Sequence, residues 1–351
     1  MKILEAIEGM HRAAGTSVFC GELCTKLSQA GHDVVLAVGN LNDEDTYPVD
    51  VHVRKALISD VVETDEMFDV VHIHAIWAPI LHVVAKWAQR KGIPVVWSPH
   101  GMITSWAMRS KWWKKWPAWI LYQKNDLKSA ALIHATAMSE VEDVLRMGLR
   151  NKIVVAPLGV NLKMVSKEMR PHKTLLFVSR VQRKKGLIMA LKAWAELRCQ
   201  GWRFRIVGPD QENHTAELKA LAHELGVFES IDFVGPKYGD DLKREYASAD
   251  LFILPTHSEN FGSVVIESLA QCVPVICTKG APWEDLVTCN CGWWIDIGVR
   301  PLVDVLSVAL KLPQKELLKM GKRGHDLVER KYTWSAVCDK MIAGYEELLK
   351  R

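Results

Sequence analysis

Two glutamates in one short segment have the type and spacing to bind a ligand that carries hydroxyls and phosphate. Glu259 and Glu267 lie eight positions apart in LPTHSENFGSVVIESLAQCVP, residues 254–274. The apolar run 250–255 predicts a buried parallel strand, and a helical pattern begins near Gly262. Glu259 is then expected in the loop and Glu267 in the second helical turn. Carboxylates around a helix N-terminus, whose free N–H groups can hold an anion, suit a sugar nucleotide.

The same spacing also fits a structural role. Thr256 and Glu259 match the capping box S/T-x-x-E, in which the glutamate only satisfies a backbone donor. Glu267 would then be a solvated helix residue. Spacing alone leaves both interpretations open.

Basic residues after another expected strand could stabilise a departing diphosphate. In SRVQRKKG, residues 179–186, Arg180 ends the strand and Lys185 precedes a glycine that opens a helix. Transfer from a nucleotide sugar needs stabilisation of charge on the leaving diphosphate, by cations, a metal or helix N-termini. Arg180 and Lys185 would provide it without a metal. The alternative is a solvated basic turn, which we expect for Arg183 and Lys184.

Two candidates follow strands in the first half of the chain. Gly15 lies between an expected strand and a helix, where backbone can pass close to a phosphate, although glycine is also common in ordinary turns. His100, in Ser-Pro-His-Gly, follows the strand 94–98 at the end where doubly wound sheets form their sites. We expect it to position substrate rather than to act as a base.

A pair of histidines alternates on the strand 69–74. His72 and His74 share one face, so a two-histidine metal site is conceivable. No third ligand at suitable spacing is evident in the sequence, and a buried or strand-end role is expected instead. We therefore predict no metal site.

Tryptophans and lysines gather in WAMRSKWWKKWPAWILY, residues 106–122. On a helix the tryptophans would fall within an arc of about 120°, with the lysines opposite. The residues are Trp112, Trp113, Trp116 and Trp119, and Lys111, Lys114 and Lys115. Aromatics opposite lysines are typical of a segment on an anionic membrane. The alternative is that the tryptophans pack in the core. Pro117 would bend such a helix.

Composition limits the class of protein. The chain has 351 residues, enough for two domains, with 49% apolar and 25% charged residues. A net charge of +4 is too small to indicate nucleic acid binding. Eight cysteines without paired zinc spacing predict reduced thiols in the cytoplasm. The N-terminal MKILEAIEGM predicts a strand rather than a signal peptide, and no apolar run reaches the length of a membrane span.

Strands and helices alternate in two successive runs, which predicts two doubly wound α/β domains. Residues 156–161, APLGVN, interrupt the alternation, so the boundaries are set at 1–160 and 161–334. The expected strands are 2–7, 33–38, 69–74, 94–98, 131–135 and 153–156, then 174–179, 204–207, 231–234, 250–255, 275–277 and 292–296. No G-x-G-x-x-G follows the first strand, which argues against a dehydrogenase.

The segment from Glu259 to Glu267 resembles the E-x7-E signature of retaining glycosyltransferases of family 4, which have the two-domain GT-B fold. Arg180 and Lys185 match the family's S-R-x-x-x-x-K-G segment. Ala14-Gly15 matches half of its usual glycine pair. One departure is Cys272, where a glycine often precedes the Pro-Val-Ile run.

The resemblance implies two Rossmann-like domains facing a cleft, with the last helix, 335–351, crossing back onto the first domain. It places Glu259 near the donor sugar, Glu267 at the ribose hydroxyls and the basic pair, Arg180 and Lys185, at the phosphates. The start of the helix completes the donor site with Gly262, Ser263 and Val264. A histidine at the position of His100 also lies near the sugar in the family. Some members have arginine there, so proton transfer is not implied.

The implied enzyme is a cytoplasmic, metal-independent hexosyltransferase without a cofactor. Its co-substrate would be a nucleoside-diphosphate sugar and its acceptor a glycan or lipid-linked saccharide. The setting would be lipopolysaccharide or exopolysaccharide assembly, at the inner face of the cytoplasmic membrane. In the family, acceptor-binding elements lie where Trp112, Trp113, Lys114, Lys115 and Trp116 occur. A GT-B sugar-nucleotide epimerase and a non-catalytic sugar-nucleotide-binding subunit remain as alternatives.

Overall fold

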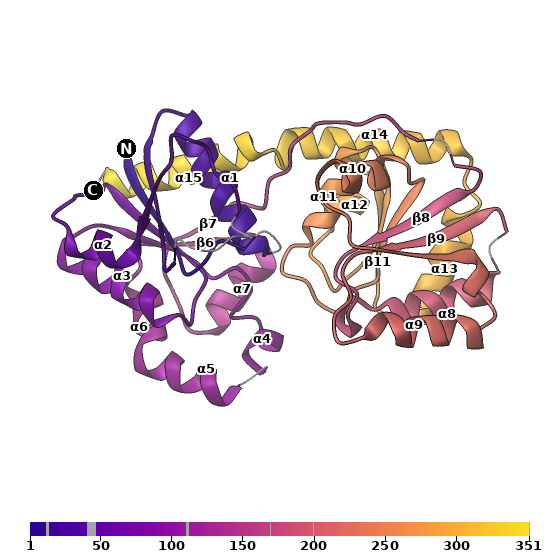
Figure 1. The fold of residues 1–351 in the computed structure, drawn as a ribbon, viewed down its shortest axis with the longest axis horizontal. Coiled ribbons are helices and arrows are strands. Elements are labelled where there is room, and N and C mark those ends of the chain that lie inside the picture. The colour runs from indigo at the N-terminus through magenta and orange to yellow at the C-terminus, as the bar shows by residue number, and fades with distance from the viewer. Residues whose placement is uncertain (12–13, 41–46, 110–111, 169, 199, 351) are drawn as a thin grey trace. The chain divides into compact units, whose positions relative to one another are not determined.

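A computed structural model describes residues 1–11, 14–40, 47–109, 112–168, 170–198 and 200–350. The chain divides into two compact units (Figure 1). The N-terminal unit comprises Met1–Gly159 and Trp334–Arg351, and the C-terminal unit comprises Val160–Thr333. These limits differ by one residue from the boundaries expected from the sequence.

The N-terminal unit is built on a seven-stranded parallel sheet in the order β3-β2-β1-β4-β5-β6-β7. Its strands are β1 (Lys2–Ile7), β2 (Asp33–Val38), β3 (Arg54–Leu57), β4 (Val70–His74), β5 (Val95–Ser98), β6 (Leu132–Ala135) and β7 (Ile153–Val155). Its helices are α1 (Gly15–Gln29), α2 (Ile58–Glu63), α3 (Pro79–Arg90), α4 (Ser105–Arg109), α5 (Trp112–Ala118), the π-helical turn (Trp119–Gln123), α6 (Lys124–Ser129), α7 (Met138–Arg146) and α15 (Trp334–Leu349).

Two hydrophobic clusters cover the two faces of this sheet, because side chains alternate along each strand. Ile3 and Ile7 of β1 pack with residues of α1 and α15, whereas Leu4 and Ala6 pack with residues of α3 and α7. The C-terminal helix α15 thus completes the core of the N-terminal unit, where it packs against α1 and β7.

The C-terminal unit has a six-stranded parallel sheet in the order β10-β9-β8-β11-β12-β13. Its strands are β8 (Lys173–Val178), β9 (Trp202–Val207), β10 (Ile231–Gly235), β11 (Leu251–Leu254), β12 (Val275–Thr278) and β13 (Gly292–Ile295). Its helices are α8 (Leu187–Leu197), α9 (His214–Glu224), α10 (Gly239–Ala247), α11 (Ser263–Ala270), α12 (Asp285–Thr288), α13 (Val299–Ala309) and α14 (Gln314–Lys331), with 3-10 turns at Arg183–Lys185 and Phe228–Ser230.

Helices lie on both faces of each sheet, with α8, α9 and α13 on one side of the second sheet and α10, α11 and α14 on the other (Figure 1). Two parallel sheets covered in this way confirm the predicted fold class of two doubly wound α/β domains. In each sheet the strand order reverses beside the unit's first strand, between β1 and β4 and between β8 and β11. Ligands of doubly wound folds bind at the carboxyl ends of the strands at such reversal points.

Candidate active site

Two loops meet at the reversal point of the C-terminal unit. One follows β8 and the other follows β11, and the two strands are neighbours. The backbone oxygen of Lys184 accepts hydrogen bonds from the His257 N–H at 2.9 Å and from the Thr256 hydroxyl at 3.2 Å. The sequence predicted both loops as site elements, and these bonds bring them together.

Gly186 allows this close approach. It has a φ of +72°, and a Cβ at this position would lie 1.9 Å from the backbone oxygen of Pro255. No other residue type fits without moving one loop, because that contact is with backbone. The glycine that the sequence placed after Lys185 therefore sets how closely the two loops pack.

Lys185 and Glu259 form an ion pair across the two loops. Their side chains are only 9% and 15% exposed. The capping-box interpretation of Glu259 is therefore wrong, because α11 begins at Ser263 and Glu259 bonds to a lysine instead. The solvated-turn interpretation is wrong for Lys185, whereas Arg183 is exposed and pairs with Glu217.

Glu267 lies in the second turn of α11, as its position in the sequence indicated. It accepts a hydrogen bond of 2.8 Å from the hydroxyl of Tyr246, a buried residue of α10, and another from Ser263. Burial raises the pKa of Glu267, although these two hydrogen bonds oppose the shift. The sequence analysis did not identify Tyr246, because a tyrosine 21 positions away has no local signal.

Arg180 and the first turn of α11 have groups that could bind an anion, namely a guanidinium and backbone N–H donors. Arg180 is exposed after β8 and makes no hydrogen bond or ion pair with any residue that the structure describes. Gly262 caps α11 with a φ of +81°. Ser263 and Val264 follow as the first helical residues, whose amides have no acceptor within the helix. The arrangement can hold an anion between a guanidinium and a helix N-terminus.

Gly15 is the first residue of α1 and is exposed. A Cβ added there would meet no atom within 4 Å, so packing does not require a glycine. Residues 12 and 13, in the same loop, lie outside the described residues. A reason for glycine at this position would have to come from a bound group.

His100 lies in the loop after β5 with a φ of +51°, a conformation that few residues other than glycine adopt. The next residue, Gly101, donates its N–H to the buried carboxylate of Glu140, at 2.5 Å. Glu140 also accepts two hydrogen bonds of 2.8 Å from Thr136. The sequence analysis did not identify Glu140, which holds the loop that presents His100.

His72 and His74 are fully buried, as expected, and a carboxylate that the sequence spacing did not reveal lies beside them. Glu5 of β1 lies between them, with its Oε2 2.6 Å from His74 Nε2 and 3.1 Å from His72 Nδ1. A zinc ion with bonds of about 2.0–2.2 Å would hold tetrahedral ligand atoms more than about 3 Å apart. A separation of 2.6 Å fits a shared proton instead.

The segment of tryptophans and lysines forms a helix that is continuous from α5 into α6. Its π-helical turn begins two residues after Pro117, which cannot donate a helical hydrogen bond. Trp119 is buried against Trp77, so the prediction that four tryptophans share one exposed arc is wrong for this residue. Trp112, Trp113 and Trp116 are exposed, at 59%, 59% and 43%. The interpretation that they pack in the core is therefore wrong.

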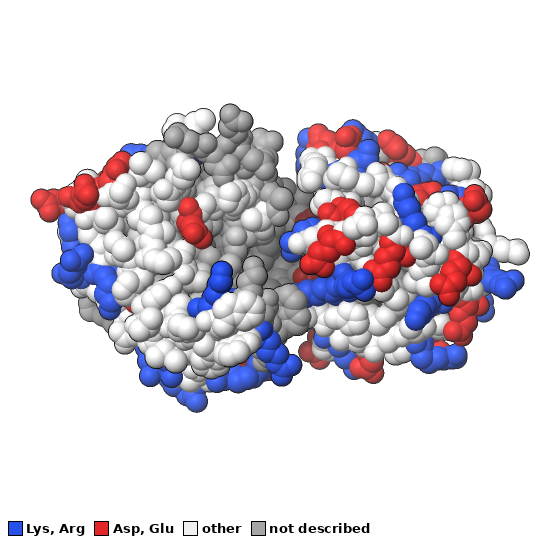
Figure 2. All heavy atoms as spheres, turned by 60° about the horizontal axis from the view of Figure 1, so that its bottom comes forward, with Lys and Arg blue, Asp and Glu red and all other residues white. Residues whose placement is uncertain are grey.

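The apolar surface continues beyond the tryptophans. Ile120 and Leu121 are 74% and 79% exposed. Cations flank them, and the described ones between residues 105 and 129 are Arg109, Lys114, Lys115, Lys124 and Lys128, while Lys111 lies outside the described residues. The acid of this stretch, Asp126, is buried against His82. In Figure 1, α5 lies at the bottom of the N-terminal unit. Figure 2 turns that side toward the viewer and shows blue side chains and little red on the lower part of the unit.

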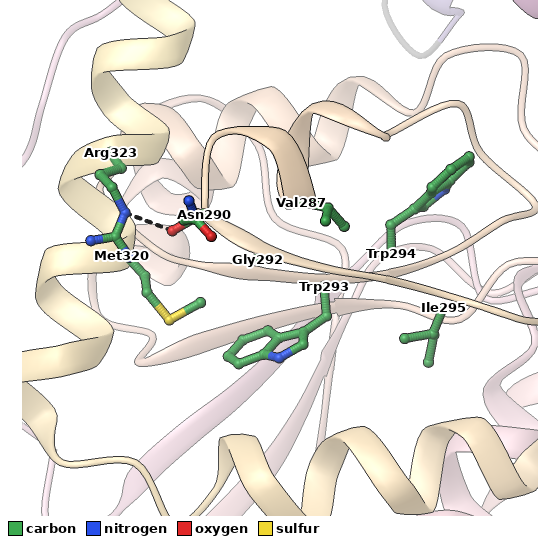
Figure 3. A pocket seen from close by; sticks show the side chains of 8 residues that line it. All are labelled: Val287, Asn290, Gly292, Trp293, Trp294, Ile295, Met320 and Arg323. Carbon is green, nitrogen blue, oxygen red and sulfur yellow. Dashed lines mark hydrogen bonds between the residues drawn. The ribbon is translucent and has the colours of Figure 1, made fainter.

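A pocket of about 410 Å³ opens on the edge strand β13 of the C-terminal unit (Figure 3). Its walls include Trp293, Ile295, Met320 and Arg323, and Arg323 donates a hydrogen bond of 2.7 Å to the backbone oxygen of Asn290. None of the candidate site residues lines it, so it is separate from the loops after β8 and β11.

Family models match almost all of the chain. Residues 13–164 match the model described as Glycosyltransferase Family 4, and residues 163–326 match the model described as Glycosyl transferases group 1. Among the described residues, no helix is both long and apolar enough to cross a bilayer.

Curated relatives align at moderate identity. A D-inositol 3-phosphate glycosyltransferase from Thermobispora bispora is 25% identical over 325 residues, 84% of this chain and 76% of the relative. A protein described as a candidate colanic acid biosynthesis glycosyltransferase, WcaL, from Escherichia coli is 27% identical over 206 residues, 54% of this chain and 49% of the relative. The chain spans about half or less of the length of several others.

Solved structures share the fold. A sucrose-phosphate synthase from Thermosynechococcus elongatus has a TM-score of 0.81 at 19% identity, with 100% of both chains covered. HepE from Anabaena, solved in complex with UDP-glucose, has a TM-score of 0.77 at 15% identity, covering 99% of this chain and 100% of that one. At these identities the likeness is one of fold.

Proposed function

The chain belongs to glycosyltransferase family 4, and we propose that it moves a sugar from a nucleoside-diphosphate sugar to a glycan or lipid-linked saccharide, with retention of configuration. The ion pair of Lys185 and Glu259, beside the N-terminus of α11, carries the proposal. It lies at the reversal point of a doubly wound sheet, where such folds bind nucleotides. The UDP-glucose bound by HepE is a ligand of the same chemical class.

The diphosphate, the ribose and the sugar of the donor each have a partner of suitable chemistry. Arg180 and Lys185 bind the diphosphate, together with the amides of Ser263 and Val264. Glu267 accepts hydrogen bonds from the ribose hydroxyls, and Tyr246 holds its carboxylate in place. In the N-terminal unit we assign Gly15 to a phosphate and His100 to the sugar, on the family resemblance.

The chemistry needs no base from the protein. The bond from the anomeric carbon to the phosphate oxygen breaks, and the acceptor oxygen bonds to the same face of the sugar. The acceptor's proton passes to the departing phosphate oxygen. Lys185 neutralises Glu259, which makes that carboxylate a weak nucleophile and disfavours a covalent intermediate. Arg180 and Lys185 stabilise the leaving diphosphate, so we propose that the reaction is metal-independent.

The acceptor side is proposed to work at an anionic membrane surface. Trp112, Trp113 and Trp116 are large, exposed and flanked by lysines, which are the groups that interfacial helices use. A lipid-linked saccharide, as expected in surface polysaccharide assembly, would be met at such a surface. The name of the Escherichia coli relative, in colanic acid biosynthesis, is consistent with this setting.

The test is transfer itself. Nucleotide sugars are first screened for stabilisation of the protein on heating, since a bound ligand raises the melting temperature. The stabilising donor is then incubated with lipid-linked and free saccharides, and the anomeric coupling of the product is read by proton NMR. We expect an α-linked donor to give an α-linked product, with activity unchanged by EDTA. A β-linked product would contradict the mechanism, and conversion of the donor without an acceptor would indicate an epimerase.

A further inference from the structure

Polar side chains line the carboxyl ends of four neighbouring strands in the N-terminal unit. They lie on the sheet face that packs against α1 and α15, where the earlier positions of the same strands are apolar. The residues are Glu5 of β1, His72 and His74 of β4, Ser98 of β5 and His134 of β6, and all are fully buried. A buried polar group must be hydrogen-bonded, so the positions of the protons in this cluster can be worked out.

One branch of the cluster is fixed by a backbone carbonyl. His134 Nε2 lies 2.7 Å from the oxygen of Ala156, which can only accept, so Nε2 carries the proton. His134 is neutral, because burial lowers its pKa to about 3, and its Nδ1 accepts from the Ser98 hydroxyl at 2.7 Å. Ser98 in turn accepts from His72 Nε2 at 2.6 Å, and His72 Nδ1 accepts from the Tyr345 hydroxyl at 2.7 Å.

The other branch runs from Glu5 through His74 to His100. His74 Nε2 lies 2.6 Å from the Glu5 carboxylate, and its Nδ1 lies 3.1 Å from His100 Nε2. Burial alone would lower the pKa of His74, but Cys20 and Glu5 beside the ring raise it to about 10. The Glu5 carboxylate is fully buried, and a buried charge needs a partner of opposite charge. His74 is the ring closest to it, so His74 carries protons on both nitrogens and donates one to His100.

His100 is left with its proton on the other nitrogen. Burial and the charge of His74 lower the pKa of His100 well below its usual value, so its ring is neutral. Its Nε2 accepts from His74, and its Nδ1 makes no hydrogen bond to any described residue. His100 as a residue is partly exposed. It thus presents an N–H donor rather than a lone pair.

We propose that Glu5 and His74 are positioning residues that lock His100 in the tautomer with its proton on Nδ1, so that His100 donates a hydrogen bond to a hydroxyl of the donor sugar. The hydrogen bond to the donor sugar rests on the proposed function, whereas the tautomer of His100 does not. It explains how a histidine can serve a reaction that needs no base from the protein, because the lone pair of His100 is occupied by His74.

The tautomer can be measured without substrate. The full-length protein is labelled with ¹⁵N histidine, and two-bond ¹H–¹⁵N spectra report which ring nitrogen of His100 carries the proton, with the signals assigned from H100Q. We expect protonated Nδ1 and unprotonated Nε2 for His100, and two protonated nitrogens for His74. A proton on Nε2 of His100 in the wild type would overturn the proposal, as would a metal ion bound stoichiometrically to the purified protein.

Variants then connect the tautomer to activity. H74L removes the donor and should release the tautomer of His100, whereas H74N keeps an N–H near the Nδ1 position and should restore it. E5Q should also release the tautomer of His100, because it removes the negative charge that keeps His74 protonated on both nitrogens. S98A is the matched control, because it also removes hydrogen bonds from the buried cluster but does not touch Glu5, His74 or His100.

We expect kcat/KM for the donor to fall about tenfold in H74L and E5Q, with the acceptor KM unchanged and with recovery in H74N. Equal losses in S98A would show a merely structural effect and overturn the positioning role. Should E5Q not fold, H74L and H74N decide the question. A wild type with no transfer activity but with the expected tautomer would contradict the proposed function and leave the tautomer lock intact.

Discussion

Lys185 and Glu259 stand 74 positions apart in the chain and form a mostly buried ion pair in the C-terminal unit. Two hydrogen bonds to the backbone oxygen of Lys184 hold the two loops together. The loops can approach this closely because Gly186 has no side chain. The lysine is thus in place before any donor binds, so little side-chain entropy remains to be lost on binding.

Arg180→Ala is expected to lower activity without lowering stability. The guanidinium has no partner among the described residues, so its removal costs the folded protein little. If it acts on the leaving diphosphate like one oxyanion-hole donor, kcat should fall by about 10²–10³. Steady-state kinetics test the expected loss of kcat, and a urea unfolding curve tests the expected unchanged stability. Arg183→Ala, on the same turn but paired with Glu217, is the matched control and should retain activity. Wild-type kinetics in Arg180→Ala would refute its role.

Lys185→Ala is expected to lower both activity and stability. The substitution leaves the Glu259 carboxylate without its partner in a largely buried position, which should cost about 1–3 kcal/mol of unfolding free energy. The double variant Lys185→Ala/Glu259→Gln removes the unpaired charge and should recover part of that loss while remaining inactive. Chemical denaturation of the two single variants and the double variant gives the coupling energy. Additive losses would mean that the pair does not interact.

The sequence predicted the positions of the two candidate loops well because each is a local pattern. Around both Arg180 and Glu259 the sequence shows a strand, a polar turn and the start of a helix in direct succession. The positions of the two loops therefore follow from the alternation of strands and helices. Tyr246 and Glu140 were missed because their roles arise from contacts between elements that the sequence does not connect. Glu5 was missed as a partner of His74 for the same reason, since 69 positions separate them.

Two elements of the fold were also missed at one edge of the first sheet. The strand Arg54–Leu57 begins with two exposed charged residues, and it has no apolar run or alternation to identify it. The helix Ile58–Glu63 that follows has only six residues, too short to show a helical period. Cys272, noted as a departure from the family's glycine, has a φ of +59°, so the glycine preference has a conformational cause.

Membrane binding is expected to depend on the exposed tryptophans. Trp112→Ala/Trp113→Ala should weaken co-sedimentation with phosphatidylglycerol vesicles about tenfold, because two large apolar side chains no longer enter the interface. Binding should also fall with added salt, since lysines near an anionic surface contribute about 1 kcal/mol each. Tyr238→Ala, a similarly exposed aromatic residue in the C-terminal unit, is the control. Absence of vesicle binding in the wild type, with a raised acceptor KM in the double variant, would assign the surface to the acceptor instead.

Stability is expected to fall on acidification below about pH 6.5. Burial lowers the pKa of His72 to about 4 and that of His134 to about 3, so the folded protein leaves both neutral. The unfolded chain binds a proton at each below its ordinary pKa near 6.5, and each then costs about 1.4 kcal/mol per pH unit. The pKa of His74 is raised to about 10, so the stability it contributes is complete below about pH 6.5. The pKa of Glu5 is lowered to about 2, so the stability it contributes is lost only below its ordinary pKa of 4.5.

Urea unfolding between about pH 6.5 and pH 5 measures this slope. His134→Gln should make it shallower, whereas His52→Gln, at an exposed histidine, should leave it unchanged. A slope that is the same in all three proteins would show that the buried histidines take up protons in the folded state.

Gly15→Ala is expected to separate folding from donor binding. The added Cβ meets no atom within 4 Å, and alanine is the better residue in a helix, so the melting temperature should stay the same or rise. If the backbone at Gly15 approaches a donor phosphate, a side chain there keeps the phosphate away and loses a charge-assisted hydrogen bond. The donor KM should then rise about tenfold or more, with the acceptor KM unchanged. Gly15→Leu should raise it further, because the effect depends on side-chain size.

Thermal unfolding and donor titration of the three proteins test this series. An unchanged donor KM in both variants would make Gly15 an ordinary turn residue and leave phosphate binding to the C-terminal unit.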